Sequence, residues 1–408
     1  MAFKSGKLQG VNVAEEYGGA GGDFLYSAIV LEELARIRAW ALQVGVHCDT
    51  SMPYLSHFGT VAQKERYLPP AVRGELLIAL ALTEPAAGSD LAGIKTRALR
   101  DGDEYVLSGS KTFISHGQTA GVVIVAAKSD PDASPPHAGV SLFLVDGDTP
   151  GFRRGRNLEK LGFKGQDTSE LFFDDCRIPA ANRLGAEGAG FKMLMAGLQQ
   201  ERLVIAVQAL ASGRRSLDDT IAYVKEREAF GQSIATFQNT QFTLAELATE
   251  IEVGQAFVDH LLAAHVRGED VVTEVSMAKW WTSALQKRLA GECLQLFGGY
   301  GFMKEYPRPS GPEGDGHAAG RAGDGREVET RNPNGLVDHV LPHFRLHHPS
   351  QFVSASSTFV ADFASLSVCG DDFVVTLTGP KGGSHVRQAR GLRPCAGAAV
   401  ARRLHWHD

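Results

Sequence analysis

The chain has 408 residues, enough for two or three domains, and its formal net charge of −6 is small for that length. It carries no basic stripe, which argues against a nucleic-acid surface and favours a small-molecule ligand. Its five cysteines form no CxxC pair, so we expect neither a metal site nor a disulfide framework, and a cytoplasmic protein. We also expect no export signal and no integral membrane segment, because no apolar run is long enough.

Helical patterns occupy the first part of the chain. In residues 24–37 the apolar side chains recur at helical spacing, and Asp23 can cap the start of that helix. A second pattern over residues 59–68 is expected to end at Pro69 and Pro70, because proline interrupts helical hydrogen bonding. We therefore predict a helical domain over residues 1–78.

The pattern then changes to short apolar and β-branched runs separated by Gly, Asp and Pro. These runs lie at residues 76–82, 122–126, 140–145 and 171–173. They predict a central β domain over residues 79–187.

Helical spacing returns after residue 179, in residues 191–214, 216–227, 236–265 and 275–296. Such long helices predict a bundle over residues 188–307. From residue 308 the chain becomes rich in Gly, Pro and charged residues, which cannot bury enough apolar surface to fold, so we expect residues 308–408 to form a disordered tail. Within it, residues 351–378 have some strand-like alternation. The predicted fold class is α+β.

Two segments of the predicted β domain have features of a cofactor site. Residues 82–90, LTEPAAGSD, combine small residues and hydroxyls that would let backbone N–H groups approach a flat polar ring or a phosphate. Residues 109–117, GSKTFISHG, place Phe113 and Ser115 on one face of a strand, which suits an isoalloxazine ring. Taken singly, an ordinary loop and a packed strand with a buried Phe remain open as alternatives.

A carboxylate interrupts an apolar stripe in the next helical segment. Leu194, Leu198, Glu201 and Ile205 share one helix face by their spacing of three and four residues. Desolvation on such a face raises the pKa of a carboxyl group towards the range of a general base. The alternative is an ion pair between helices, with Arg202 or a more distant Arg as the partner.

Two further segments could contact a cofactor. Arg227 lies in the segment REAFGQ at residues 227–232, where a forked guanidinium at a helix end suits a pyrophosphate. Residues 295–302, QLFGGYGF, lead from a helix into a Gly-rich turn that could contact a cofactor through its backbone. A solvated helix end is the alternative for the first of them.

Together and in this order, these segments resemble the acyl-CoA dehydrogenases over residues 10–307. The resemblance implies a helical domain, a central β-barrel domain and a helical bundle, assembled as a homo-oligomer, a tetramer or a dimer, with FAD at subunit interfaces. The implied FAD contacts, partly from a neighbouring subunit, are Leu82, Thr83, Gly88, Ser89, Phe113, Ser115, Arg227, Phe230, Phe237, Gln238, Gln295, Gly298 and Gly299.

Members of this family differ in the position of their catalytic Glu. The long-chain and isovaleryl branches have it in the helix that here contains QERL at residues 200–203, so Glu201 resembles that base. The segments at residues 277–281 and 292–296 resemble the long-chain branch more. The resemblance implies oxidation of a long-chain acyl-CoA to a trans-2-enoyl-CoA, with electrons passed to an electron-transfer flavoprotein. The implied substrate contacts are Ser89, Leu198, Gln199 and Arg202.

Two departures from the family pattern leave other functions open. The N-terminal domain is expected to be shortened, and after Pro307 the chain lacks the family's helix, Arg-Asp pair and Gly-Gly-Thr loop. An out-of-frame reading of a GC-rich gene is one hypothesis for that change. A catalytically impaired remnant or an acyl-CoA-binding protein on the same fold is therefore an alternative. A flavin-dependent oxidase or monooxygenase is a further one, which Glu201 disfavours.

Overall fold

The computed structural model describes residues 9–39, 44–303 and 305–306, and the backbone of three strands between residues 363 and 388. The chain divides into two units, Met1–Pro333 and Asn334–Asp408. The second unit contains an antiparallel sheet of β11 (Phe363–Cys369), β12 (Asp372–Thr378) and β13 (Ser384–Gln388). Strand-like alternation in residues 351–378 thus coincides with two of these strands. All three strands lie within the tail predicted to be disordered over residues 308–408, and the rest of that tail lies outside the described residues.

The first unit begins with short helices. These are η1 (Glu15–Tyr17), α1 (Phe24–Arg36), the π-helix η3 (Val46–Ser51), α2 (Met52–Phe58) and α3 (Val61–Val72). Asp23 caps α1 as predicted, because its side chain accepts a hydrogen bond from the Leu25 N–H at 2.9 Å. None of the described helices combines the length and apolar character needed to cross a membrane.

Helix α3 does not end where proline was expected to end it. Pro69 and Pro70 lie inside the helix, which continues to Val72. The prolines have no N–H to donate to the carbonyl groups of Glu65 and Arg66, and both of these residues are exposed, so water can bind in place of the missing donors. At the opposite end, Thr60 and Gln63 form a reciprocal capping box that starts the helix.

The central domain is an eight-stranded sheet in the order β6-β7-β3-β2-β4-β5-β8, with β1 paired to β4. Its hydrogen-bonded path has two ends within the described residues, so the expected barrel is open, and its two halves meet at a single β2–β4 residue pair. The strands are β1 (Ile78–Ala81), β2 (Arg97–Asp101), β3 (Glu104–Ser115), β4 (Val122–Lys128), β5 (Val140–Asp146), β6 (Phe152–Asn157), β7 (Thr168–Pro179) and β8 (Arg183–Leu184).

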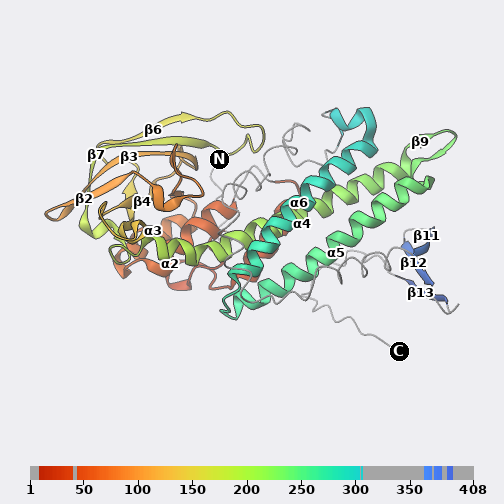
Figure 1. Ribbon diagram of the computed structural model, residues 1–408, viewed down its shortest axis with the longest axis horizontal. Helices are drawn as coiled ribbons and strands as arrows, with labels where there is room; N and C mark the ends of the chain where they lie inside the picture. The colour runs from red at the N-terminus through yellow and green to blue at the C-terminus, as the bar shows by residue number, and fades with distance from the viewer. Residues whose placement is uncertain are drawn as a thin grey trace. The chain divides into compact units, whose positions relative to one another are not determined.

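Three long helices pack together beyond the sheet (Figure 1). They are α4 (Gly190–Glu226), α5 (Gln238–Val266) and α6 (Val272–Phe297), followed by the short η8 (Gly298–Phe302). Between α4 and α5 lie the hairpin of β9 (Glu228–Ala229) and β10 (Gln232–Ser233) and the turn η7 (Ile234–Thr236).

The two helices predicted over residues 191–214 and 216–227 form one continuous helix, α4. Nothing in this stretch removes a backbone donor, and Gly213 is accommodated by packing, since a Cβ there would lie 2.6 Å from Leu289 on α6. Ser216 continues the helical pattern by donating its hydroxyl to the Ser212 carbonyl at 3.0 Å. One continuous helix therefore runs from the central sheet to the β9–β10 hairpin.

Candidate active site

Helix α4 brings Glu201 against the N-terminal helices. Leu194, two turns earlier, is 2 % exposed and belongs to a core that also contains Tyr54 and residues of β1, β4 and β5. The Tyr54 hydroxyl donates a hydrogen bond of 2.8 Å to Oε1 of Glu201. Burial raises the pKa of Glu201, while this hydrogen bond and the charge of Arg202 oppose the rise. The pKa of Glu201 is thus raised, as the apolar helix face predicted.

The alternative of an interhelical ion pair does not fit this geometry. Among the described residues Glu201 has Tyr54 as its hydrogen-bond partner, and Arg202 donates from Nη1 to the Ser276 hydroxyl on α6 at 2.8 Å. Gln199 also binds away from the carboxylate, accepting from the Val271 N–H at 3.0 Å. Glu201 therefore has the environment of a partly desolvated carboxyl group rather than that of a paired one.

The predicted substrate residues have different surroundings. Leu198 is half-buried on α4, and Ser89 is exposed in the loop after β1. The side chains of Gln199 and Arg202 bind groups of the α5–α6 loop and of α6, respectively. Contact between these four residues and a substrate stays a prediction.

A buried ion pair that the sequence motifs did not reveal connects the two cofactor segments of the central domain. The Lys111 ammonium on β3 lies 2.8 Å from Glu84 Oε1 and donates to the Leu82 carbonyl at 2.9 Å. Glu84 accepts two more hydrogen bonds, from the N–H groups of Lys95 and Thr96. The loop after β1 is thereby fixed against β3, with Leu82 and Thr83 half-buried and Gly88 exposed.

Phe113 is presented to solvent instead of being packed. The register between β3 and β7 shifts between Lys111 and Ile114, and Phe113 has a φ of 59°, a strained value for a large side chain. As a result its ring is 66 % exposed, while Ile114 is buried and Ser115 is half-buried. The alternative of a buried core Phe is wrong, and the bulge instead offers an aromatic face beside the loop after β1.

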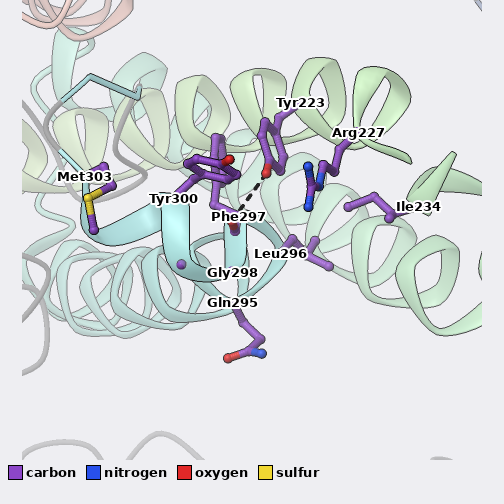
Figure 2. A pocket seen from close by; sticks show the side chains of 10 residues that line it. Tyr223, Arg227, Ile234, Gln295, Leu296, Phe297, Gly298, Tyr300 and Met303 are labelled. Carbon is purple, nitrogen blue, oxygen red and sulfur yellow. Dashed lines mark hydrogen bonds between the residues drawn. The ribbon is translucent and has the colours of Figure 1, made fainter. Parts of the chain in front are cut away.

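The other half of the predicted cofactor site lies where α4 meets the end of α6. A cavity of about 400 Å³ is open there, and Arg227, Gln295, Gly298 and Gly299 all line it. Figure 2 shows the Arg227 side chain beside Tyr223, with Gln295 pointing away from them. The remaining lining residues are Tyr223, Ile234, Leu296, Phe297, Tyr300 and Met303.

Aromatic rings build the wall of this cavity. Tyr223 stacks on Phe297 with ring centroids 4.2 Å apart, and its hydroxyl donates to the Phe297 carbonyl at 3.4 Å (Figure 2). The Arg227 guanidinium lies 5.6 Å from the centre of the Tyr300 ring. A cation beside flat rings suits an anionic group that is attached to an aromatic base.

Three further predicted cofactor residues lie outside the cavity. Phe230 and Gly231 have φ values of 54° and 76° and form the two-residue tip of the β9–β10 hairpin, which leaves the Phe230 ring 96 % exposed. Phe237 contacts that ring edge-on, with centroids 6.2 Å apart, and Gln238 starts α5. Phe230 and Phe237 lie at or next to the β9–β10 hairpin, outside the cavity, and do not enclose a ligand by themselves.

No residue of the central domain lines the cavity, so the two predicted halves of the cofactor site are separate within one chain. Sequence reasoning missed Tyr54, Glu84 and Lys111. The Glu84 and Lys111 positions lie inside the two quoted motifs, but their pairing across 27 residues has no local signal. Tyr54 is 147 residues from Glu201 and has none either.

Comparison with known proteins agrees with this arrangement. Family models for the N-terminal, middle and C-terminal domains of acyl-CoA dehydrogenases match residues 2–75, 79–176 and 188–310. The long-chain specific acyl-CoA dehydrogenase of Mus musculus is 46 % identical over 306 residues, which cover 74 % of this chain and 71 % of the mouse protein. The isovaleryl-CoA dehydrogenase of Pongo abelii is 38 % identical over 299 residues, 73 % of this chain and 71 % of that protein.

A solved structure shows the same fold. The crystal structure of an acyl-CoA dehydrogenase from Geobacillus kaustophilus matches with a TM-score of 0.75 and 48 % identity, covering 80 % of this chain and 86 % of that one. Sequence, fold and the predicted motifs therefore agree, and the chain belongs to the acyl-CoA dehydrogenase family of oxidoreductases, with strong similarity to its long-chain members.

Proposed function

We propose that this protein catalyses the FAD-dependent α,β-dehydrogenation of a long-chain acyl-CoA to a trans-2-enoyl-CoA, with Glu201 as the base. The observation that carries the proposal is the Glu201 carboxyl group, which is partly buried on α4 and hydrogen-bonded to Tyr54. By the family resemblance, Glu201 corresponds to the base of the long-chain and isovaleryl branches. The greater identity to the long-chain relative than to the isovaleryl one supports the choice of substrate.

The role of Glu201 follows from the chemistry of a thioester. Its α C–H is a weak acid, so a carboxylate with a raised pKa is better matched to it than an ordinary one. The enolate that develops needs hydrogen-bond donors aimed at the thioester oxygen. Glu201 takes the α proton, and bound FAD supplies the acceptor for the hydride that leaves the β carbon.

The residues present fit FAD in two parts. The exposed ring of Phe113 beside the fixed loop after β1 suits the flavin ring, and Gly88 has open space above its backbone. Arg227 and the backbone of Gly298 and Gly299, which also face open space, suit the pyrophosphate and adenosine. Because these parts are separate in one chain, we propose a homo-oligomer, a dimer or a tetramer, in which each FAD is held by two subunits.

The domain boundaries at residues 78, 187 and 307, the passage of electrons to an electron-transfer flavoprotein and a cytoplasmic location belong to the same proposal. Three described cysteines, Cys48, Cys176 and Cys293, are buried free thiols, in keeping with a reducing compartment. No feature of the described residues favours an impaired remnant or an oxidase.

The visible absorption spectrum of the purified protein tests the proposal. We expect a flavin spectrum that bleaches on anaerobic addition of palmitoyl-CoA, and a Glu201→Gln variant that keeps the flavin but does not bleach. Glu187→Gln, which alters an exposed carboxylate on the loop before α4, is the matched control and should bleach normally. Bleaching by Glu201→Gln at the native rate would remove Glu201 from the mechanism.

A further inference from the structure

Tyr54 holds the proposed base from a different domain. Its side chain is 2 % exposed on α2, and its hydroxyl reaches α4 to donate to Glu201 Oε1 at 2.8 Å. Burial raises the pKa of Tyr54 far above its ordinary value, and the neighbouring Glu201 charge raises it further. The phenol therefore stays protonated and remains a donor at any working pH.

The helix makes room for this contact with a glycine. A Cβ at Gly197, one turn before Glu201, would lie 2.3 Å from the Tyr54 hydroxyl and 3.2 Å from Glu201 Oε1. Glycine in the interior of a helix is less stable than alanine, so an alanine here would favour α4 but displace the phenol. The space at Gly197 is thus matched to the Tyr54–Glu201 pair.

We propose that Tyr54 is a positioning residue for Glu201: its phenol fixes Oε1 and leaves Oε2 to take the substrate proton. This inference rests on the proposed role of Glu201 as the base. A donated hydrogen bond stabilises a carboxylate, so Tyr54 keeps a larger fraction of Glu201 ionised than burial alone would allow. The phenol sets both the orientation of the base and the pH at which it becomes active.

Other titratable groups surround this turn of α4 and must be separated from Tyr54. Arg202 is the neighbouring charge on α4 itself. Asp49 on η3 is buried and accepts from Gln200 through its backbone carbonyl, and burial raises the pKa of its carboxyl group to about 7. His57 on α2 and His265 on α5 are close to each other, and burial lowers the pKa of both.

The test is the pH dependence of α-proton exchange. Holoenzyme is incubated anaerobically with palmitoyl-CoA in a series of D2O buffers, and deuterium at the α carbon is followed by mass spectrometry. Tyr54→Phe should move the acid limb of the profile to higher pH by about one to two units, as expected for loss of a hydrogen bond to a buried charge. Gly197→Ala should move it in the same direction with Tyr54 still present.

Matched variants keep the outcomes distinct. Tyr67→Phe also removes a buried phenol that donates to a carboxylate, Asp146 at 3.0 Å, and should leave the profile unchanged, as should Asp49→Asn. If Glu201→Gln exchanges like the native protein, the proposed base is wrong. If Glu201→Gln abolishes exchange while Tyr54→Phe keeps the native profile, or shifts it no more than Tyr67→Phe does, the positioning role is overturned and the base is retained.

Discussion

The Lys111 ammonium is fully buried where the loop after β1 meets β3, and its partner Glu84 is 6 % exposed. Burial lowers the pKa of Lys111 to about 8, and the charge of Glu84 limits that fall. Both side chains are buried, so neither is needed for solubility. The pair instead fixes Leu82 and Thr83, whose carbonyls accept from the Lys111 ammonium and the Thr112 N–H.

We predict that Lys111→Met lowers the free energy of unfolding by about 3 to 5 kcal/mol, because Glu84 then keeps a buried charge without its cation. Flavin content should fall with it. The double variant Glu84→Gln with Lys111→Met should lose less stability than Lys111→Met alone. Urea unfolding and the flavin-to-protein absorbance ratio measure both effects. A double variant that is less stable than the single one would show that the charge is not what matters here.

Spacing and family resemblance predicted Glu201 and Phe113 as site residues, and their roles stay predictions. The surroundings of these residues could not be predicted from the motifs. The outward turn of Phe113, however, depends on a register shift against β7, a strand more than 50 residues later in the sequence. Tyr54 and Lys111 act through contacts between distant segments, and single-sequence patterns do not encode such contacts.

At the scale of elements, periodicity located the helices. The expectation that a proline or an interrupted pattern ends a helix failed where solvent or tertiary packing compensated for an unfavourable residue. Pro69 and Pro70 remain in α3 because the carbonyls that they leave without donors belong to exposed residues. Gly213 remains in α4 because it allows the close approach of Leu289. The pairing of strands could not be predicted from the sequence pattern, because β1 pairs in parallel with β4, more than 40 residues away.

The π-helix η3 places two buried titratable groups with opposite effects next to each other. His47 accepts the Ile78 N–H at Nδ1 and approaches the Ala71 carbonyl with Nε2, and burial lowers its pKa to about 4. Asp49 has a buried Oδ1 with no hydrogen-bond partner among the described residues, and burial raises its pKa to about 7. Both groups are therefore neutral in the folded state over a shared range of pH.

We predict that His47 and Asp49 change the free energy of unfolding with pH in opposite directions, so that their effects largely cancel in the native protein. The unfolded chain protonates His47 near pH 6.5, so that residue makes stability fall as pH drops from about 6.5 to about 4. Asp49 ionises in the unfolded chain near pH 3.8, so it makes stability fall as pH rises from there to about 7. Asp49→Asn should expose a stability that rises with pH by about 3 kcal/mol, from His47, and His47→Gln should expose one that falls with pH by about 4 kcal/mol, from Asp49.

Urea unfolding of the three proteins across this range measures these slopes. His57→Gln, a histidine on neighbouring α2, is the control and should leave the native profile nearly flat, because burial lowers its pKa less. If Asp49→Asn and His47→Gln have slopes of the same sign, the assignment of opposed titrations is wrong.

At the scale of the whole molecule, the order of helical, β and helical segments, read with the motifs, was sufficient for the fold and the family. The separation of the two cofactor half-sites was not visible in the motifs, which name residues without saying which of them meet. In the first unit, Phe113 belongs to β3 of the sheet, and Arg227 directly follows α4 at the β9–β10 hairpin. Figure 1 shows the sheet and this hairpin at opposite ends of α4. Because the two half-sites are separate in one chain, the proposed FAD site needs residues from two subunits.

Intersubunit complementation tests the shared site. We predict that Phe113→Glu and Arg227→Glu each lower the flavin content of the homo-oligomer, the first by placing a charge under the flavin ring and the second by repelling the pyrophosphate. When both variants are co-expressed with different affinity tags and the mixed dimer is isolated, one of its two sites combines a native central domain with a native helical half. Flavin content should then return to about half of the native value, as the two-fold symmetry of a dimer requires.

A chain that carries both substitutions is the control, and its homo-oligomer should stay colourless. If the mixed dimer binds no more flavin than either homo-oligomer, each FAD is held within a single chain, and the cavity beside Arg227 must serve another ligand.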